Sequence, residues 1–527
     1  MKKLLLACSA LGLTALALAS DVGAGDAKPN PIILIGMDGG EWSVIERLWA
    51  EGKLPNLKRM SEEGVRAPLK SHYGMSPVIW TTIATGMKDT KHGIEAFTIF
   101  TEEGDVPFSA TLRKVPAVWN MLSTVDRRAA VLSWWASWPA EEINGHIITE
   151  KGQTDLERRV SPASWQAAFE QELSVVNSEQ VLFKGGADFA PEDRMTLHFA
   201  KKFASEQQHD LILAYFRGTD AVSHKYWKWW EPEAFENVTE AGMEKYGSKV
   251  PEKYVATDKA IGQIIKAAPK NTNFFIVSDH GFHAAPDEPI KLTLDSNELF
   301  VAMGLLTYQK GTTLPDCSKS TVYTHLSPTN AKKKKLRLCM AGRDEGGTLT
   351  EKDKAAKLAE LQRTLNGVTF DNGGRIFTFR EPNGSDDEVE ADLILEVTPN
   401  ADDVSKVLVY KGQKIKGPIG RTAVVTGTHP ESPPGIFIAW GPDINPSVSA
   451  AGVDIHDITP TLLYGLNLPI AEDFDGRPWI ELFSAEFQKA WPMKHIASWG
   501  KMGDTNVTRS SEDDATLEQL RELGYID

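Results

Sequence analysis

The chain has 527 residues, of which 24% are charged, 41% are hydrophobic and only 3 are cysteines. This composition excludes a wholly disordered, collagen-like or disulfide-scaffold protein, and at about 150 residues per domain the length fits several domains or one large α/β domain with insertions. With a formal net charge of −15, the chain lacks the basic surface that binds a nucleic-acid polymer. A small anionic substrate stays possible, because a bound metal can reverse the local field.

The start of the chain has the pattern of a cleaved signal peptide. Lys2 and Lys3 form a short positive end, residues 4–18 are nearly all apolar, and Ala17 and Ala19 are small residues suited to cleavage. The apolar run is too short for a membrane-spanning helix of about 20 residues, and no comparable run follows. We therefore expect a periplasmic or secreted protein without a transmembrane segment. A lipoprotein site at Cys8 is the alternative, although only four apolar residues directly precede it.

Short apolar runs, typical of buried strands, alternate with amphipathic helical patterns along the chain. The predicted strands are 31–37, 211–216, 273–277, 422–426 and 435–440. The predicted helices include 43–52, 162–173 and 254–267. Buried strands that alternate with helices predict an α/β fold, with a mostly parallel central sheet and helices on both of its faces.

The chain is predicted to divide into a catalytic domain with one large insertion. The predicted parts are a signal peptide at 1–20, a catalytic domain at 21–285 and 417–501, an inserted cap region at 286–416 and a C-terminal tail at 502–527. The cap region contains four consecutive lysines at 332–335, which we expect to form a solvated loop rather than an anion-binding patch. In the tail, Leu517, Leu520 and Leu523 predict a short helix with one apolar face.

The expected export determines which cysteines remain in the mature chain and whether they can form a disulfide. Cys8 would leave with the signal peptide, so the mature chain would hold only Cys317 and Cys339, 22 positions apart. Two cysteines at this distance in an oxidising compartment indicate one disulfide, with two unpaired thiols as the alternative. Neither cysteine lies near a histidine at metal-ligand spacing, so a cysteine-based zinc site is not expected.

Acidic and histidine side chains follow four of the predicted strands. They are Asp38, Asp220, His224, Asp279, His280 and His429. Because ligands bind outside the carboxyl ends of the strands in open α/β sheets, we expect all six to converge on one rim. Three aspartates and three histidines exceed one tetrahedral zinc site and suit two divalent ions, Zn²⁺ before Mn²⁺ or Fe, whereas Mg²⁺ and Ca²⁺ would not need the histidines. A set of solvated loop acids and capping residues is the alternative.

A candidate nucleophile, Ser76, opens the segment SPVIWTTIATG. The proline after it and the final Gly86 predict a helix that begins here and ends at the glycine. A helix N-terminus attracts phosphate, and a metal ion there would help to deprotonate the Ser76 hydroxyl. The alternative is that Ser76 is only an N-cap. The hydroxyls of Thr81, Thr82 and Thr85 are expected to bond back to preceding carbonyls.

The motifs GMDGG, SPVIWTTIATG with KHGI, TDAVSH, SDHG and TGTHP, in this order, resemble those of the alkaline phosphatase superfamily. Within it they are most similar to the type I phosphodiesterase/nucleotide pyrophosphatase family. The resemblance extends to DITPTLLYGLNLPIAEDFDGRP and to the terminal LRELGYI. It implies an alkaline-phosphatase-like fold with an inserted cap, and an exported two-zinc hydrolase that acts on a small phosphorylated substrate, with phosphodiester or pyrophosphate bonds preferred.

The resemblance also implies a role for each site residue. It implies one zinc held by Asp220, His224 and His429, a second held by Asp38, Asp279 and His280, and the Ser76 oxygen between them. Ser76 lies nine positions before Thr85, as the nucleophile does in the family's helix that ends in TG. In such an enzyme the serine attacks phosphorus, and water then releases the phosphoserine.

Two departures from the family pattern bear on the substrate. Nucleotide pyrophosphatases usually carry threonine as nucleophile, and the position of a phosphate-binding asparagine is occupied here by Phe97. A phosphomonoesterase or a phosphonate hydrolase of the same superfamily is therefore an alternative, although monoesterases carry an arginine where Pro77 stands. A non-catalytic exported binding protein is another, but it would be expected to lack a ligand or the nucleophile, and every such position is filled. The oligomeric state is open.

Two tryptophan-rich segments, 133–139 and 226–230, carry aromatic side chains that can stack on a nucleobase or a sugar. Large aromatic residues are more often part of the core, and we expect this for most of them. Because the second segment directly follows His224, it is the better candidate for a pocket wall.

Overall fold

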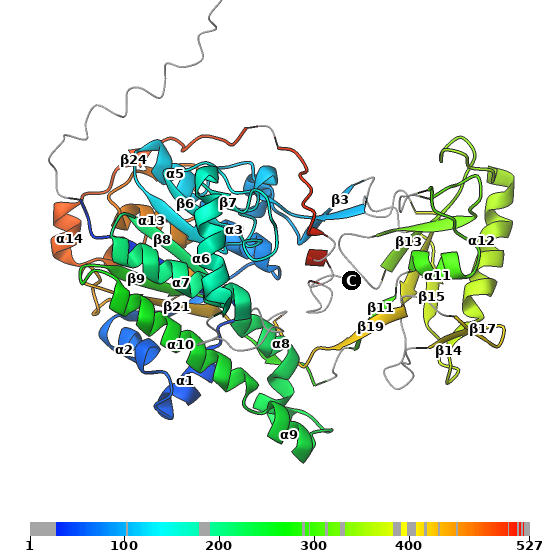
Figure 1. The fold of residues 1–527 in the computed structure, drawn as a ribbon, viewed down its shortest axis with the longest axis horizontal. Helices are drawn as coiled ribbons and strands as arrows, with labels where there is room; N and C mark the ends of the chain where they lie inside the picture. The colour runs from blue at the N-terminus through cyan, green and yellow to red at the C-terminus, as the bar shows by residue number, and fades with distance from the viewer. Residues whose placement is uncertain are drawn as a thin grey trace, which may run out of the picture.

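Figure 1 shows the fold of the chain in a computed structural model. The structure describes residues 28–101, 104–178, 190–286, 290–294, 296–310, 315–326, 333–382, 391–397, 407–415, 419–429, 433–449, 452–503, 505–513, 516–517 and 520. The predicted signal peptide at 1–20 lies outside these residues. Over the part of the chain that is described, no helix has both the length and the apolar character needed to cross a membrane.

The larger lobe is built on a nine-stranded sheet with the strand order β22-β2-β21-β9-β1-β8-β5-β6-β7. Its strands are β1 (Ile32–Met37), β2 (Val65–Lys70), β5 (Ala129–Leu132), β6 (Gly145–Ile148), β7 (Val160–Ser161), β8 (Leu211–Phe216), β9 (Asn273–Val277), β21 (Gly435–Trp440) and β22 (Val453–Asp454). At its centre β1 pairs in parallel with both β8 and β9. β21 runs antiparallel to β2 and β9, and β7 runs antiparallel to β6. The sheet is therefore mostly parallel, as predicted.

Helices cover both faces of this sheet (Figure 1). One face packs against α3 (Ser76–Thr85), α5 (Val118–Thr124) and α13 (Ile458–Gly465). The other packs against α1 (Trp42–Ala50), α2 (Pro55–Glu63), α6 (Gln166–Ser178), α7 (Ala190–Glu206) and α10 (Lys249–Ala267). Because both faces are covered, every residue of β1, β8 and β9 is buried. This explains why these strands are continuous apolar runs rather than alternating patterns.

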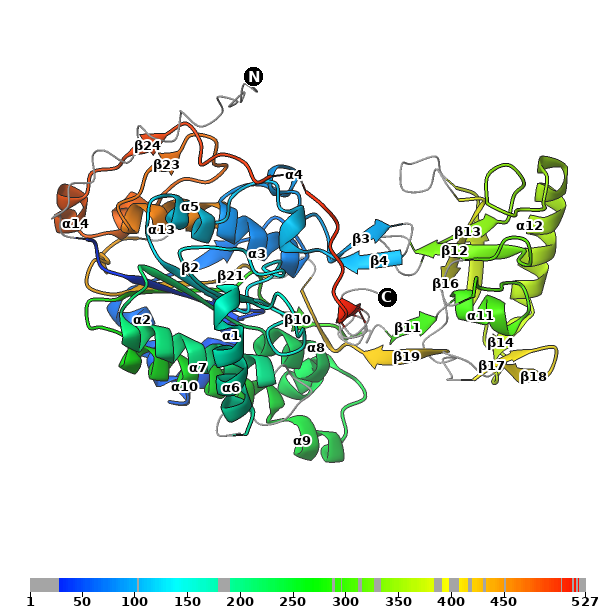
Figure 2. The same ribbon diagram turned by 45° about the horizontal axis from the view of Figure 1, so that its top comes forward.

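The predicted strand 422–426 is not part of the main sheet. The strand that forms there is β19 (Ile419–Val424), and it pairs antiparallel with β11 (Ile290–Leu294). These two strands form the ribbon by which the chain leaves the larger lobe and returns to it (Figure 2). An apolar run indicates that a strand forms, but its pairing partner depends on distant residues, and this part of the prediction is wrong.

The ribbon leads to a smaller lobe with its own hydrophobic core, drawn in green and yellow in Figure 2. One sheet has the order β12-β13-β16-β15, and a second has the order β14-β17-β18. The elements are α11 (Ser296–Ala302), β12 (Val322–Leu326), β13 (Lys333–Leu338), α12 (Glu351–Asn366), β14 (Val368–Phe370), β15 (Phe377–Arg380), β16 (Leu393–Val397), β17 (Leu408–Tyr410) and β18 (Gln413–Ile415). Cys317 and Cys339 are joined in this core by a disulfide with an S–S distance of 2.07 Å.

The lysine run differs from its prediction as a solvated loop. β13 includes three of these lysines and lies between β12 and β16. Along the strand Lys334, Leu336 and Leu338 are buried. This spacing of two places them on one face of the sheet, so pairing with β12 and β16 and burial of this face outweigh the charge of the run.

The C-terminal tail lies against the larger lobe. Lys151 Nζ and Asp513 Oδ1 form a buried ion pair at 2.6 Å, and Thr111 Oγ1 donates to the Asn506 carbonyl oxygen at 2.6 Å. Leu517 and Leu520 are buried, whereas Leu523 lies outside the described residues.

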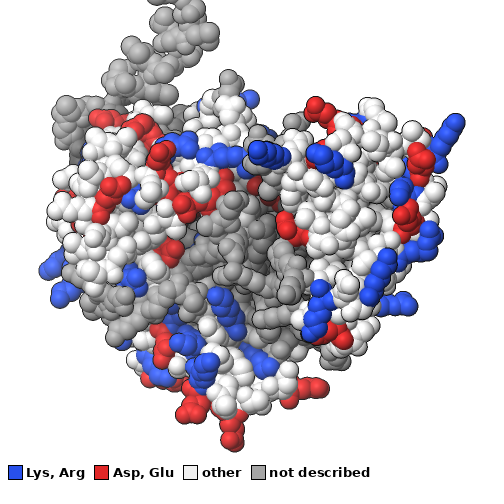
Figure 3. Space-filling model, turned by 45° about the vertical axis from the view of Figure 1, so that its right-hand side comes forward, with Lys and Arg blue, Asp and Glu red and all other residues white. Residues whose placement is uncertain are grey.

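On the face drawn in Figure 3, the Lys and Arg side chains are interspersed with Asp and Glu.

Candidate metal centre

The central strands deliver five of the six candidate ligands to one rim. Asp38 directly follows β1, and Asp279 and His280 follow β9. Asp220 and His224 lie one turn apart on α8 (Gly218–Trp230), the helix that follows β8. Because β9, β1 and β8 are parallel neighbours, their carboxyl ends lie side by side, which brings these side chains together.

The sixth residue, His429, reaches the rim by another route. It follows β20 (Gly427–Thr428), which pairs antiparallel with β10 (His283–Ala284). β20 packs closely on α8, because a Cβ atom at Gly427 would lie 2.3 Å from the Ser223 carbonyl oxygen. Glycine is required at this contact, and the close approach places His429 beside His224, with ring centroids 5.1 Å apart.

The six side chains form two groups of three. They are Asp220, His224 and His429, and Asp38, Asp279 and His280, and within each group the potential ligand atoms lie within 4.8 Å of one another. The groups adjoin: the rings of His280 and His429 stack with centroids 3.9 Å apart. His280 Nε2 also lies 3.7 Å from Asp38 Oδ1 and 3.8 Å from Asp220 Oδ1. These are the two sets that the sequence resemblance implied.

Burial perturbs the acids of this cluster. It raises the pKa of Asp38 and of Asp220 well above the ordinary value, and the negative charges of neighbouring aspartates raise both further. It raises the pKa of Asp279 to about 6 and lowers the pKa of His280. Within the described residues, Asp38 Oδ1, Asp279 Oδ2 and both carboxylate oxygens of Asp220 have no hydrogen-bond partner. Carboxylates buried together in this way fit the binding of cations.

Hydrogen bonds from outside the cluster orient its members. Tyr215 donates from its hydroxyl to Asp38 Oδ2, and Gly39 N donates to Asp279 Oδ1 at 3.2 Å. His224 Nδ1 lies 2.9 Å from the Gly427 carbonyl oxygen, and His280 Nδ1 lies 3.0 Å from that of Gly281. A ring that donates from Nδ1 directs its Nε2 toward the cluster, as metal-binding histidines do. The sequence analysis missed Tyr215, whose only signal is a hydroxyl within a buried apolar strand.

Ser76 is the first residue of α3, and its side chain is buried at the rim. Its hydroxyl faces Asp279 closely enough to contribute to lowering the pKa of that carboxyl, against the larger effect of burial. Met75, not Ser76, is the N-cap, because the Met75 carbonyl accepts the first helical hydrogen bonds, from Val78 N and Ile79 N. The alternative in which Ser76 serves only as an N-cap is therefore wrong.

Two further expectations for α3 agree with the structure. Thr82 Oγ1 donates to the Val78 carbonyl oxygen at 2.9 Å, and Thr85 Oγ1 donates to that of Thr81 at 2.8 Å. Gly86 ends the helix in the left-handed conformation with φ +68°. Both threonine hydroxyls thus bond to the helix backbone. The expectation is wrong for Thr81, whose buried Oγ1 has no hydrogen-bond partner among the described residues.

The aromatic segments belong mainly to the core. Phe97 is buried and packs edge-to-face on Trp135, with centroids 5.9 Å apart, so this position presents no hydrogen-bond donor. Trp227 is buried and stacks on Phe282. The centroid of the Phe282 ring in turn lies 4.9 Å from that of His224. The second tryptophan segment therefore contacts the site indirectly, through Phe282. Trp134 and Trp138 are buried as well.

Comparisons with known proteins identify the family of this chain. The sequence model of the type I phosphodiesterase/nucleotide pyrophosphatase family matches residues 32–406, which is more than half of the chain. Among solved structures, human ectonucleotide pyrophosphatase/phosphodiesterase 5 is 14% identical, with a TM-score of 0.46, and the murine protein is 13% identical, with a TM-score of 0.46. Each alignment covers 86% of this chain and 100% of the other. No curated protein matches. By the family match, the chain belongs to the type I phosphodiesterase/nucleotide pyrophosphatase family.

Proposed function

We propose that the chain is a two-metal hydrolase that cleaves phosphodiester or pyrophosphate bonds through a phosphoserine on Ser76. Family membership supports phosphate-ester hydrolysis. The observation that carries the finer proposal is the meeting of two groups of histidine and aspartate beside the buried Ser76. Two divalent ions bound there, with zinc the first choice for these donors, would neutralise the phosphate and stabilise the attacking and leaving oxygens.

The protein's own residues hold and orient the reacting groups. One ion would be held by Asp220, His224 and His429, and the other by Asp38, Asp279 and His280. The hydrogen bonds from Nδ1 of His224 and His280 to backbone carbonyl oxygens fix the orientation of both rings. Such a preorganised site spends little free energy on rearrangement during the reaction.

Ser76 performs the covalent step. Its Oγ loses its proton to solvent and attacks phosphorus, the bond from phosphorus to the leaving oxygen breaks, and the leaving group takes up a proton and departs. The phosphoserine that remains still carries the second substituent of the diester or pyrophosphate. Water then attacks its phosphorus, which releases that phosphorylated product and restores the hydroxyl. The place of Ser76 at the start of α3 suits this chemistry, because free N–H groups and the positive end of the helix dipole favour a phosphate there.

We also propose that the protein is exported and acts on a small phosphorylated substrate. Export rests on the leader pattern at 1–20. N-terminal sequencing of the protein secreted by its host would show a start close to residue 21. A mature protein that retains Met1 would contradict export and leave the proposed chemistry untouched.

The test of the function combines metal analysis with rates on matched phosphate mono- and diesters. Purified protein should contain about two zinc ions in these groups and favour the diester. His429→Ala should lower zinc content and activity together, since His429 is the only ligand brought by β20. The control is His283→Ala, on the paired strand β10, which should keep both. Unchanged zinc content in His429→Ala would remove His429 from the ligands, and a monoester preference would overturn the assignment to diesters.

A further inference from the structure

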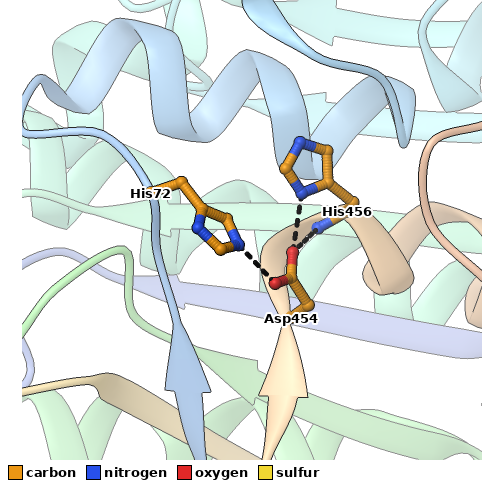
Figure 4. Close-up of side chains that lie close together, drawn as sticks. All are labelled: His72, Asp454 and His456. Carbon is orange, nitrogen blue, oxygen red and sulfur yellow. Dashed lines mark hydrogen bonds and ion pairs between the residues drawn. The ribbon is translucent and has the colours of Figure 1, made fainter.

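A third group of metal-binding side chains lies apart from the rim, at one edge of the main sheet (Figure 4). His72 follows β2 by two residues, Asp454 ends β22, and His456 lies in the short helix η6 (Ile455–Asp457). β2 and β22 are parallel neighbours, with Lys70 opposite Asp454. The pairing of these edge strands therefore brings together residues that are 382 positions apart in the sequence.

Both histidine rings point toward the Asp454 carboxylate, each toward a different oxygen, as Figure 4 shows. His72 Nε2 lies 2.5 Å from Asp454 Oδ2, and His456 Nδ1 lies 2.6 Å from Asp454 Oδ1. All three potential ligand atoms lie within 4.8 Å of one another. Two imidazole nitrogens and one carboxylate oxygen form a donor set that suits Zn²⁺ and related transition metals.

The exposure of the group leaves room for a further ligand. The His456 side chain is 8% exposed, that of Asp454 is 28% exposed and that of His72 is 56% exposed. A cation held by the three residues would thus be anchored on the protein side and open to water on the His72 side. Three protein ligands and one water complete a tetrahedral zinc site.

Helix capping accounts for part of this arrangement only. Asp454 caps η6 by accepting from His456 N at 3.1 Å, which requires the carboxylate alone. It does not require the exposed His72 ring, and an exposed ion pair gains little while it restricts a side chain. In the metal-free protein a proton lies between nitrogen and oxygen in each short contact, and a bound metal ion would displace these protons.

We propose that His72, Asp454 and His456 bind a third divalent transition-metal ion, with Zn²⁺ the best match to the donors. His72 lies four residues before Ser76, and η6 packs against α3. The ion would therefore tie the loop that enters the nucleophile helix to the edge of the sheet. Its role is to hold the structure at this edge, and it is independent of the two ions proposed for the rim.

The test counts zinc ions in the full-length protein. Chelator-stripped protein is titrated with Zn²⁺ against a chromogenic zinc indicator, which reports the equivalents bound. Wild type should bind one equivalent more than His72→Ala and one more than Asp454→Asn. His72→Ala suits the test because the ring is exposed and its loss leaves the core intact. The matched control is His495→Ala, which removes an exposed histidine elsewhere and should bind as wild type does.

The difference between variants separates this proposal from that for the rim. If the rim binds no zinc, wild type should still bind one equivalent more than His72→Ala. If wild type and His72→Ala bind the same number of equivalents, the group is a hydrogen-bonded His–Asp–His cluster and the proposal is overturned. Zinc should also raise the melting temperature of stripped wild type more than that of stripped His72→Ala, and equal shifts would count against the site.

Discussion

The buried acids of the two lobes differ in how their charge is balanced. In the smaller lobe Asp392 contacts Arg343 Nη2 at 2.8 Å and Lys354 Nζ at 2.7 Å. Burial alone would raise the pKa of Asp392, but the hydrogen bonds from these two cations outweigh it and hold the pKa below its ordinary value. At the rim of the larger lobe, burial and neighbouring aspartates instead raise the pKa values of Asp38 and Asp220.

The smaller lobe balances its buried carboxylate with its own side chains, whereas the rim of the larger lobe does not. The smaller lobe has positively charged side chains beside Asp392, a separate hydrophobic core and a disulfide. The rim concentrates negative charge that a cation from solution can neutralise. We therefore expect changes in the smaller lobe to alter stability with little effect on chemistry, and changes at the rim to do the reverse.

The largest expected effect is that of Ser76→Ala on turnover. Removal of one hydroxyl closes the covalent route while all six proposed ligands stay, so turnover should fall by at least about 10³-fold with metal content and fold kept. Steady-state rates, zinc analysis and circular dichroism check this. Acid quench of wild type during turnover should trap phosphate on the peptide that contains Ser76.

Thr81→Ala, within the same helix, is the control for Ser76→Ala. It should lower the free energy of unfolding through lost packing and leave turnover close to that of wild type. A near-normal rate for Ser76→Ala, or phosphate trapped on Thr81 or Thr82, would show that the nucleophile is another residue.

Removal of the disulfide should affect stability only. The paired replacements Cys317→Ser and Cys339→Ser release a loop with a sequence separation of 22. A cross-link of this size stabilises by about 3 kcal/mol in chain-entropy accounts. Denaturant unfolding should show this loss, while turnover of the folded enzyme stays within about twofold. A loss of turnover as large as that of Ser76→Ala would mean that the two lobes cannot be separated in this way.

Replacing one acid in each lobe should change stability in opposite directions. Asp392→Asn removes a charge that two cations balance, and should lower the free energy of unfolding by about 2 kcal/mol. Asp220→Asn in metal-free protein removes repulsion among buried acids, and should raise it by about 1 kcal/mol. Urea unfolding with a chelator present measures both. A destabilising Asp220→Asn would show that the rim is balanced without metal.

The metal-free rim should also show a pH dependence of its stability. Burial raises the pKa of Asp279 to about 6, above its ordinary 3.8. Between these values the native state binds more protons than the unfolded state, so this group lowers stability as pH rises from about 4 to about 6. The slope is at most about 1.4 kcal/mol per pH unit. Unfolding of stripped wild type and Asp279→Asn across this range should differ by this falling contribution, and equal slopes would contradict it.

The buried strands and the residues at their ends could be predicted from the sequence. The runs in β8 and β9 have the predicted boundaries, because a strand covered on both faces must be apolar throughout. The rule that ligands gather at the carboxyl ends of such strands then brought Asp220 and Asp279 together with their neighbours. The division of the six residues into two groups came from the resemblance to a known family.

Features that depend on distant pairing escaped the prediction. The partner of β19 is β11, and no local pattern names that partner. The lysines of β13 lie in a sheet because strands on both sides supply hydrogen bonds. His72 and His456 carried no signal individually, since a single histidine after a strand is usually structural.

The sequence by itself determined the periodicity of the buried elements and the chemistry at the ends of the central strands, since both are properties of consecutive residues. Only the tertiary structure decided which distant strands lie side by side in the sheet. It placed β22 beside β2, and so His456 beside His72. It also placed the hydroxyl of Tyr215 on Asp38. Contacts between distant segments depend on the packing of the whole core, so no pattern of consecutive residues determines them.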